Sequence, residues 1–113
     1  MSDAPPADDL FRALASETRR DVLEALQRRE SIPLDELADT LVGRGTTSGP
    51  ADVDERAQTK IELVHAHVPL LVDAGLVAHD ESAGEVSLTT LPEPVEELLT
   101  FAAEYERSRR RHR

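Results

Sequence analysis

The sequence predicts a mainly α-helical domain that carries one small β-hairpin. Three observations lead to this fold class. Apolar residues recur at helical spacing over residues 52–74, apolar and polar residues alternate over 85–89, and glycine, proline and hydroxyl residues gather at 43–50. With 113 residues and no internal repeat, the chain has the length of one domain.

The longest predicted helix runs from Asp52 to Ala74. Asp52 and Glu55 have the spacing of a capping box, and Gly75 readily closes a helix in the left-handed conformation. The apolar residues of this helix fall on one stripe, which we expect to face the core: Ala57, Ile61, Val64, Val68 and Leu71. The opposite side of the helix is therefore predicted to be presented to a partner.

Shorter elements precede this helix. Pro5 and Pro6 disfavour a helix start, so residues 1–8 are predicted to form a flexible acidic tail, and Asp8 or Asp9 caps the short helix that follows. Ser16 is a candidate N-cap for the next helix. The other elements predicted before Asp52 are a helix over 17–29, a short extended segment over 31–33, a helix over 34–41 and a loop over 43–50.

A hairpin is predicted after the long helix. Its strands cover residues 76–80 and 85–89, and Val86 and Leu88 alternate with polar residues in the second strand. Gly84 supplies the turn conformation between the two strands.

The last helix is predicted over about 95–107, with Pro94 in its first turn. The folded domain is therefore expected to span residues 9–107, and residues 108–113 form an arginine-rich tail. This tail either contacts DNA phosphates or an acidic partner, or it complements the negative end of the last helix and then frays.

The composition is strongly acidic, with 23 acidic residues against 13 basic ones and a net charge of −10. Lys60 is the only lysine. Abundant carboxylates with almost no lysine resemble the proteins of halophiles, whose hydrated acidic surfaces stay soluble in molar salt. The alternative is an ordinary acidic protein of a mesophile. Because the chain contains no apolar run long enough to span a membrane and starts with an acidic, proline-rich segment, we expect a cytoplasmic protein.

Three runs of the sequence resemble ArsR-type transcription regulators. They are LFRALASETRRDVLEALQRR at 10–29, LDELADTL at 34–41 and IELVHAHVPLLVDAGLV at 61–77. The last run is similar to the end of a recognition helix and the start of a wing. The chain is accordingly identified as resembling the small winged helix-turn-helix proteins of haloarchaea, and the resemblance covers residues 10–105.

This resemblance implies a DNA-binding transcription regulator that acts as a homodimer. The recognition helix would lie in the major groove of duplex DNA, where base edges can be distinguished. The residues expected to bind DNA are Arg56, Gln58, Thr59, Lys60, Leu63, His65, Ala66 and His67, with Arg19 and Arg20 as backbone contacts. The residues expected to form the dimer interface are Leu10, Phe11, Val95, Leu98, Leu99, Ala102 and Tyr105.

The chemistry of the chain argues against a metal, a cofactor and an enzyme. There is no cysteine, and His65 and His67 are two residues apart, whereas a helical metal pair needs a spacing of four. The runs 34–41 and 95–112 lack the cysteine pair and the Asp/His set that ArsR metal sensors carry. No catalytic motif is recognisable either, so we expect regulation without metal.

Several features favour a second hypothesis, a winged-helix module that binds a protein and not DNA. The predicted hairpin turn over 80–85 is acidic, and carboxylates repel phosphate. Residues 42–51 are longer than the usual turn of a helix-turn-helix, and Pro69 predicts that the long helix kinks near 65–68 or ends there. Such a module would use the side of the helix that carries Leu63, Ala66 and Leu70, or the acidic wing.

Overall fold

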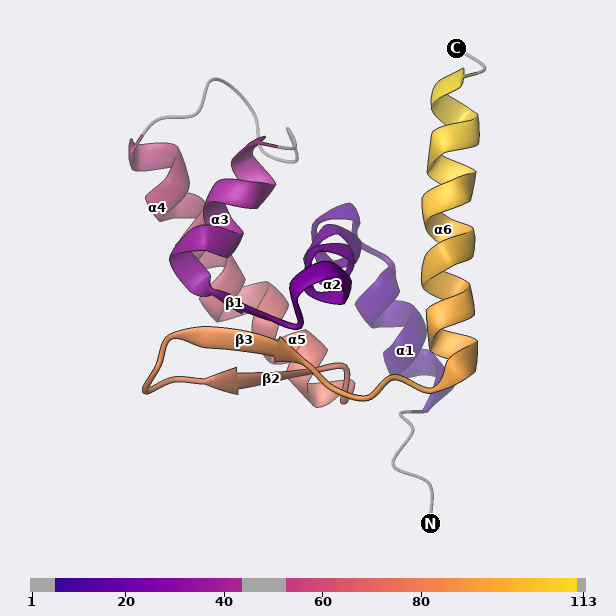
Figure 1. Cartoon of the computed structure of the whole chain (residues 1–113), viewed down its shortest axis with the longest axis horizontal. Coiled ribbons are helices and arrows are strands. Elements are labelled where there is room, and N and C mark those ends of the chain that lie inside the picture. The colour runs from indigo at the N-terminus through magenta and orange to yellow at the C-terminus, as the bar shows by residue number, and fades with distance from the viewer. Residues whose placement is uncertain (1–5, 44–52, 112–113) are drawn as a thin grey trace.

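A computed structural model describes residues 6–43 and 53–111 of the chain. Six α-helices, one π-helical turn and three strands make up the described part (Figure 1). In chain order they are α1 (Ala7–Leu14), α2 (Glu17–Arg29), β1 (Ser31–Pro33), α3 (Leu34–Gly43), α4 (Val53–Glu62), η1 (Leu63–His67), α5 (Val68–Asp73), β2 (Val77–Asp80), β3 (Glu85–Leu88) and α6 (Glu93–Arg111). The predicted mainly helical class with a small hairpin is confirmed, while β1 adds a third strand to it.

The three strands form one antiparallel sheet in the order β1-β3-β2. Ile32 lies opposite Val86 in the β1–β3 pair, and Val77 lies opposite Leu88 in the β2–β3 pair. The Leu34 N–H donates to the carbonyl of Gly84 at 2.8 Å, which ties the start of α3 to the hairpin turn. The short segment after α2 is therefore an edge strand of the sheet.

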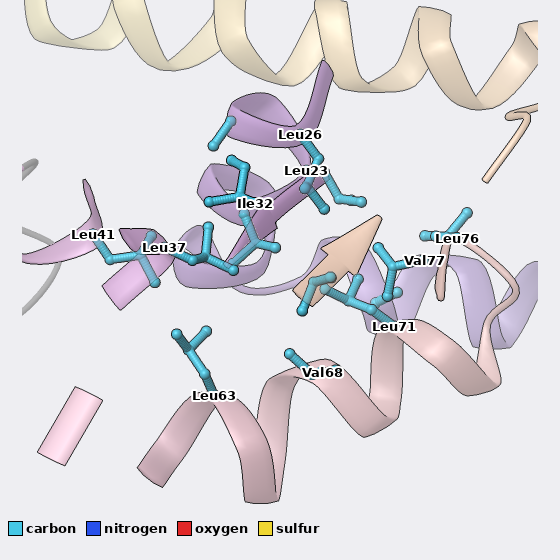
Figure 2. Close-up of a cluster of buried hydrophobic side chains, with 14 of the residues drawn as sticks. Leu23, Leu26, Ile32, Leu37, Leu41, Leu63, Val68, Leu71, Leu76 and Val77 are labelled. Carbon is cyan, nitrogen blue, oxygen red and sulfur yellow. The ribbon is translucent and has the colours of Figure 1, made fainter. Parts of the chain in front are cut away.

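The hydrophobic core lies between the helices and this sheet. Figure 2 shows side chains from α2, α3 and the segment 53–73 converging on one cluster, with Leu23, Leu37 and Leu63 fully buried. Val86 of β3 is fully buried as well, whereas its neighbour Ser87 is half-buried. The sheet thus covers the core with one face, as its alternating pattern predicts.

Local signals in the sequence were accurate at several element ends. The Ser16 hydroxyl accepts from the backbone N–H of Arg19 at 3.3 Å, which confirms Ser16 as the N-cap of α2. Gly75 and Gly84 have φ values of +76° and +68°, so each occupies the left-handed conformation at its predicted turn.

Two helices differ from the predictions at their ends. The first helix starts at Ala7, directly after Pro6, and no side chain caps it, so Asp8 and Asp9 lie inside its first turn. A carboxylate in that turn is favourable next to the positive end of the helix, so no capping side chain is required. The last helix runs from Glu93 to Arg111 and is longer at both ends than predicted.

Other predictions fall partly or wholly outside the described residues. They concern the start of the acidic tail at 1–5, residues 44–50 of the predicted 43–50 loop, the proposed capping residue Asp52, and the end of the arginine tail at 112–113, whereas Gly43 belongs to α3. Within the described ranges, no helix combines the length and the apolar character that crossing a membrane requires.

Candidate nucleic-acid interface

The segment 53–73, which comprises α4, η1 and α5, is called the presenting segment below. Its α5 half buries Val68 and Leu71 as predicted. Its α4 half does not follow the predicted stripe: Ile61 is 52% exposed and Ala57 is exposed, whereas Leu63 is 0% and Thr59 is 4% exposed. The prediction that Thr59 and Leu63 face a DNA groove is therefore wrong, and so is the prediction that Ile61 faces the core.

A π-helical turn at 63–67 explains why Leu63 is buried and Ile61 is exposed. The Val68 N–H donates to the carbonyl of Leu63, five residues earlier, so the turn holds one residue more than an α-helical turn. The buried stripe consequently takes a five-residue step from Leu63 to Val68, and α4 is rotated by about 100° relative to the extrapolated pattern.

Pro69 lies just after this turn, in the first turn of α5. A proline has no N–H to donate four residues back, and its ring clashes with the carbonyl at that position in a regular helix. The wider turn before it lets the helical path continue without that clash. The predicted interruption at 65–68 is thus a change of helix type and not a separation into two helices.

The rotation creates an exposed outward ridge on α4 and η1, which we define as Ala57, Gln58, Ile61 and His65. All four side chains are exposed. At about 100° per residue they lie within about 60° of Ile61, opposite the buried Leu63. Gln58 and His65 were predicted to face DNA, while Ile61 and Ala57 were not. The sequence feature that indicates an exposed Ile61 and Ala57 is the five-residue spacing between Leu63 and Val68, directly before Pro69.

The cations of α4 lie beside the ridge and pair with α3. Arg56 Nε is 2.9 Å from Asp39 Oδ1, and Lys60 Nζ is 2.7 Å from Asp35 Oδ1. Both carboxylates are largely exposed. These pairs join α4 to α3 and leave the two cations that were predicted to face the DNA groove partly neutralised.

Arg19 and Arg20, the predicted backbone contacts, are both engaged inside the fold. Arg19 Nε and Nη2 donate to the carbonyls of Ala13 and Arg12 at 2.9 and 2.8 Å. Arg20 Nη1 donates to the carbonyl of Leu14 at 2.6 Å. Both arginines therefore cap the carbonyl end of α1. The last backbone carbonyls of a helix have no N–H partner within the helix, so these side chains supply the donors. Their predicted role as free phosphate contacts is not supported by this geometry.

Arg20 also reaches α6, where its Nη2 lies 3.8 Å from Glu106 Oε1. This contact spans a groove of about 470 Å³ between α2 and α6. Charged side chains of both signs line the groove, among them Glu17, Asp21 and Arg110. Over residues 6–43 and 53–111, no group of three or more potential metal ligands comes together.

His67 connects the presenting segment to α1 through Arg19. Arg19 Nη1 lies 3.3 Å from His67 Nδ1, and because a guanidinium can only donate, the imidazole accepts through Nδ1. Burial lowers the pKa of His67, the Arg19 charge lowers it further, and Glu62 acts in the opposite direction. A half-buried, neutral His67 is therefore a structural contact at the end of the π-helical turn, and its predicted role in DNA contact is not supported. Ala66 is exposed beside it.

The acidic turn of the hairpin is partly used for local structure. Asp80 Oδ1 accepts from the backbone N–H of Ala83 at 3.1 Å, and Glu85 Oε1 accepts from the Ser31 hydroxyl at 2.8 Å. Asp80 thus stabilises the turn, and Glu85 joins it to β1, while Glu81 is exposed.

The predicted dimer residues divide into two groups. Val95 and Leu99 are buried against the core of the same chain, and Leu10, Leu98 and Ala102 are half-buried. Phe11 and Tyr105 are 59% and 55% exposed. Phe101, which was not among the predicted residues, is 66% exposed and stacks on Tyr105 at a centroid distance of 6.1 Å. Figure 1 shows α6 at the edge of the molecule.

A family model described as a domain of unknown function (DUF7344) matches residues 11–87. The matched range contains the presenting segment and the hairpin, and it ends before α6. No curated protein matches the chain, and no solved structure does.

Proposed function

The chain belongs to the DUF7344 family, whose function is unknown, and from this premise we propose that it is a DNA-binding transcription regulator of ArsR-like winged helix-turn-helix type. In this proposal α3 and α4 are the helix pair, the presenting segment contains the recognition helix, and β2 with β3 is the wing. The protein acts as a homodimer and needs no metal for binding.

The observation that carries this proposal is the outward ridge. The presenting segment is docked on the core through Thr59, Leu63 and Val68, yet one whole face of its α4 half is exposed. A helix of this kind fits the major groove of B-form DNA. The hairpin follows directly from α5, and β2 contacts α5, so a second element lies next to the helix in the position of a wing.

Exposed aromatic rings support self-association as part of the same proposal. Phe101, Tyr105 and Phe11 are each more than half exposed, on the two helices that resemble the dimerising helices of the ArsR family. Large exposed aromatic side chains lose unfavourable contact with water when a second copy covers them. A two-fold dimer would place two presenting segments toward adjacent turns of one DNA face.

Fluorescence anisotropy on duplexes from the upstream region of the gene, in molar potassium chloride, tests the proposal. We expect saturable binding by a species that sedimentation equilibrium identifies as a dimer. Replacing Gln58 with glutamate puts a negative charge on the ridge and should abolish binding, because the carboxylate meets the DNA phosphates. Gln27→Glu, the same change at an exposed position of α2, is the matched control and should bind normally.

One observation favours a second candidate, a module that binds a protein. The ridge is uncharged around Ile61, and the neighbouring Arg56 and Lys60 are paired with Asp39 and Asp35. A folded dimer that binds no duplex, while Gln58→Glu and Gln27→Glu behave alike, would contradict the DNA-binding proposal and leave the protein-binding module.

A further inference from the structure

We propose that the outward ridge recognises the methyl groups of thymine and one adenine edge, so that the preferred DNA site is centred on A·T pairs. This inference rests on the proposed function and adds the base specificity to it. It follows from which side chains the π-helical turn leaves exposed.

The centre of the ridge is apolar. Ile61 is 52% exposed, and Ala57, one helical turn earlier, is exposed as well. In the major groove the one apolar group on a base edge is the C5 methyl group of thymine, which apolar side chains contact. The branched aliphatic side chain of Ile61, at the centre of the ridge, therefore makes a more favourable contact with thymine than with any other base.

Gln58 supplies the polar contact beside this apolar centre. Its side chain carries both a donor and an acceptor, which is the arrangement that pairs with N6 and N7 of adenine. It lies about 60° from Ile61 around the helix and one turn away from it, so the two side chains reach neighbouring base pairs. An adenine next to a thymine is the expected consequence.

The ridge lacks the side chains that read guanine. Arginine and lysine make the usual bidentate contacts to guanine, but Arg56 and Lys60 both lie on the side of α4 that faces α3, where they pair with Asp39 and Asp35. Glu62, which is exposed on the flank and not at the centre of the ridge, can only accept, from adenine N6 or cytosine N4, and therefore offers no donor to guanine. The centre of the site is thus expected to contain no G·C pair.

Apolar recognition also suits a chain with a net charge of −10. Contacts to phosphate weaken steeply as salt rises because the release of counterions into concentrated salt gains less entropy, whereas contacts to methyl groups do not depend on charge. A readout based on methyl groups therefore retains its preference in molar salt.

The test compares thymine with uracil, which differs only by the methyl group. A duplex is first selected from a pool with a randomised centre, in molar potassium chloride, and is then resynthesised with deoxyuridine in place of thymidine. We expect the selected centre to be rich in A·T pairs and the native protein to bind the thymine duplex about tenfold more tightly. Ile61→Ala should reduce affinity for the thymine duplex to that for the uracil duplex and leave the latter unchanged.

Val72→Ala is the matched control, because Val72 is an exposed aliphatic residue of the same segment outside the ridge, at 39% exposure. It should retain the full preference for thymine. Binding of neither duplex nor pool by the folded native protein would overturn the proposed function itself. Equal affinity for the thymine and uracil duplexes, or a selected centre rich in G·C pairs, would overturn only the inference about bases.

Discussion

The two halves of the presenting segment share one hydrophobic pattern in the sequence but bury different parts of it. In α5 the patterned residues Val68 and Leu71 are buried, and in α4 the patterned residue Ile61 is exposed while Leu63 takes its place in the core. The π-helical turn that joins the halves separates their helical phases. One extra residue in a turn therefore decides which face of α4 a partner can reach.

The comparison also explains why the predicted DNA-binding residues were only partly suitable. Thr59 and Leu63 were placed on the outer side by extrapolating the phase of α5 back into α4. When the extra residue of the π-helical turn is counted, Gln58 and His65 still lie on the exposed side of the helix, and Ile61 lies there as well. The presented face changes as a result, from one that was expected to contain Thr59, Leu63 and Ala66 to one centred on Ile61.

The largest expected effect concerns stability. Replacing Leu63 with alanine removes a fully buried side chain and should lower the free energy of unfolding by about 3 kcal/mol, through lost burial and the cavity left behind. Ile61→Ala, two residues away, should change it by less than about 0.5 kcal/mol because the side chain is half exposed already. Urea denaturation of the two variants measures this contrast. Equal losses would contradict this contrast, and a larger loss for Ile61→Ala would show that α4 has the phase extrapolated from α5.

A smaller effect is expected at Arg19, which ties the junction of the two halves to α1. Arg19→Met removes three hydrogen bonds, two of them to carbonyls at the end of α1, and should cost about 2 kcal/mol of stability. Arg28→Met is the matched control on the same helix, since Arg28 makes an exposed pair with Glu24 at 3.2 Å. Thermal denaturation should show a clearly lower melting temperature for the first variant alone. Similar losses in both would contradict a structural role of Arg19 at this junction.

The smallest effect is a pH dependence that arises where the halves meet. The pKa of His67 is lowered in the folded protein, chiefly by burial and then by Arg19, from an ordinary value of 6.5. The unfolded chain therefore takes up a proton at a higher pH than the folded one. The stability that His67 contributes is complete above pH 6.5 and is lost as the pH falls through its lowered pKa.

His67→Gln isolates this contribution, because the amide oxygen still accepts from Arg19 but does not titrate. The melting temperature of the native protein should fall between pH 7.5 and 5.5 by more than that of the variant, measured by circular dichroism at fixed salt. Parallel curves for the two proteins would exclude His67 as the source of the pH dependence.

The sequence by itself determined the features that depend on a few neighbouring residues. The Ser16 cap, the left-handed conformations of Gly75 and Gly84 and the alternation around Val86 are all set by local chemistry, so their positions were predictable. The order of helices and strands follows from these signals, which is why the mainly helical class with a hairpin was predictable as well.

Only the tertiary structure decided which side of α4 faces outward and which cations remain available. Packing against the core selects the buried Leu63 over Ile61, and α3 brings Asp35 and Asp39 to Lys60 and Arg56. The carbonyl end of α1 likewise engages Arg19 and Arg20, the two predicted phosphate contacts of α2. These outcomes depend on residues distant in the chain, because a helical phase and an ion pair are fixed by what the helix packs against.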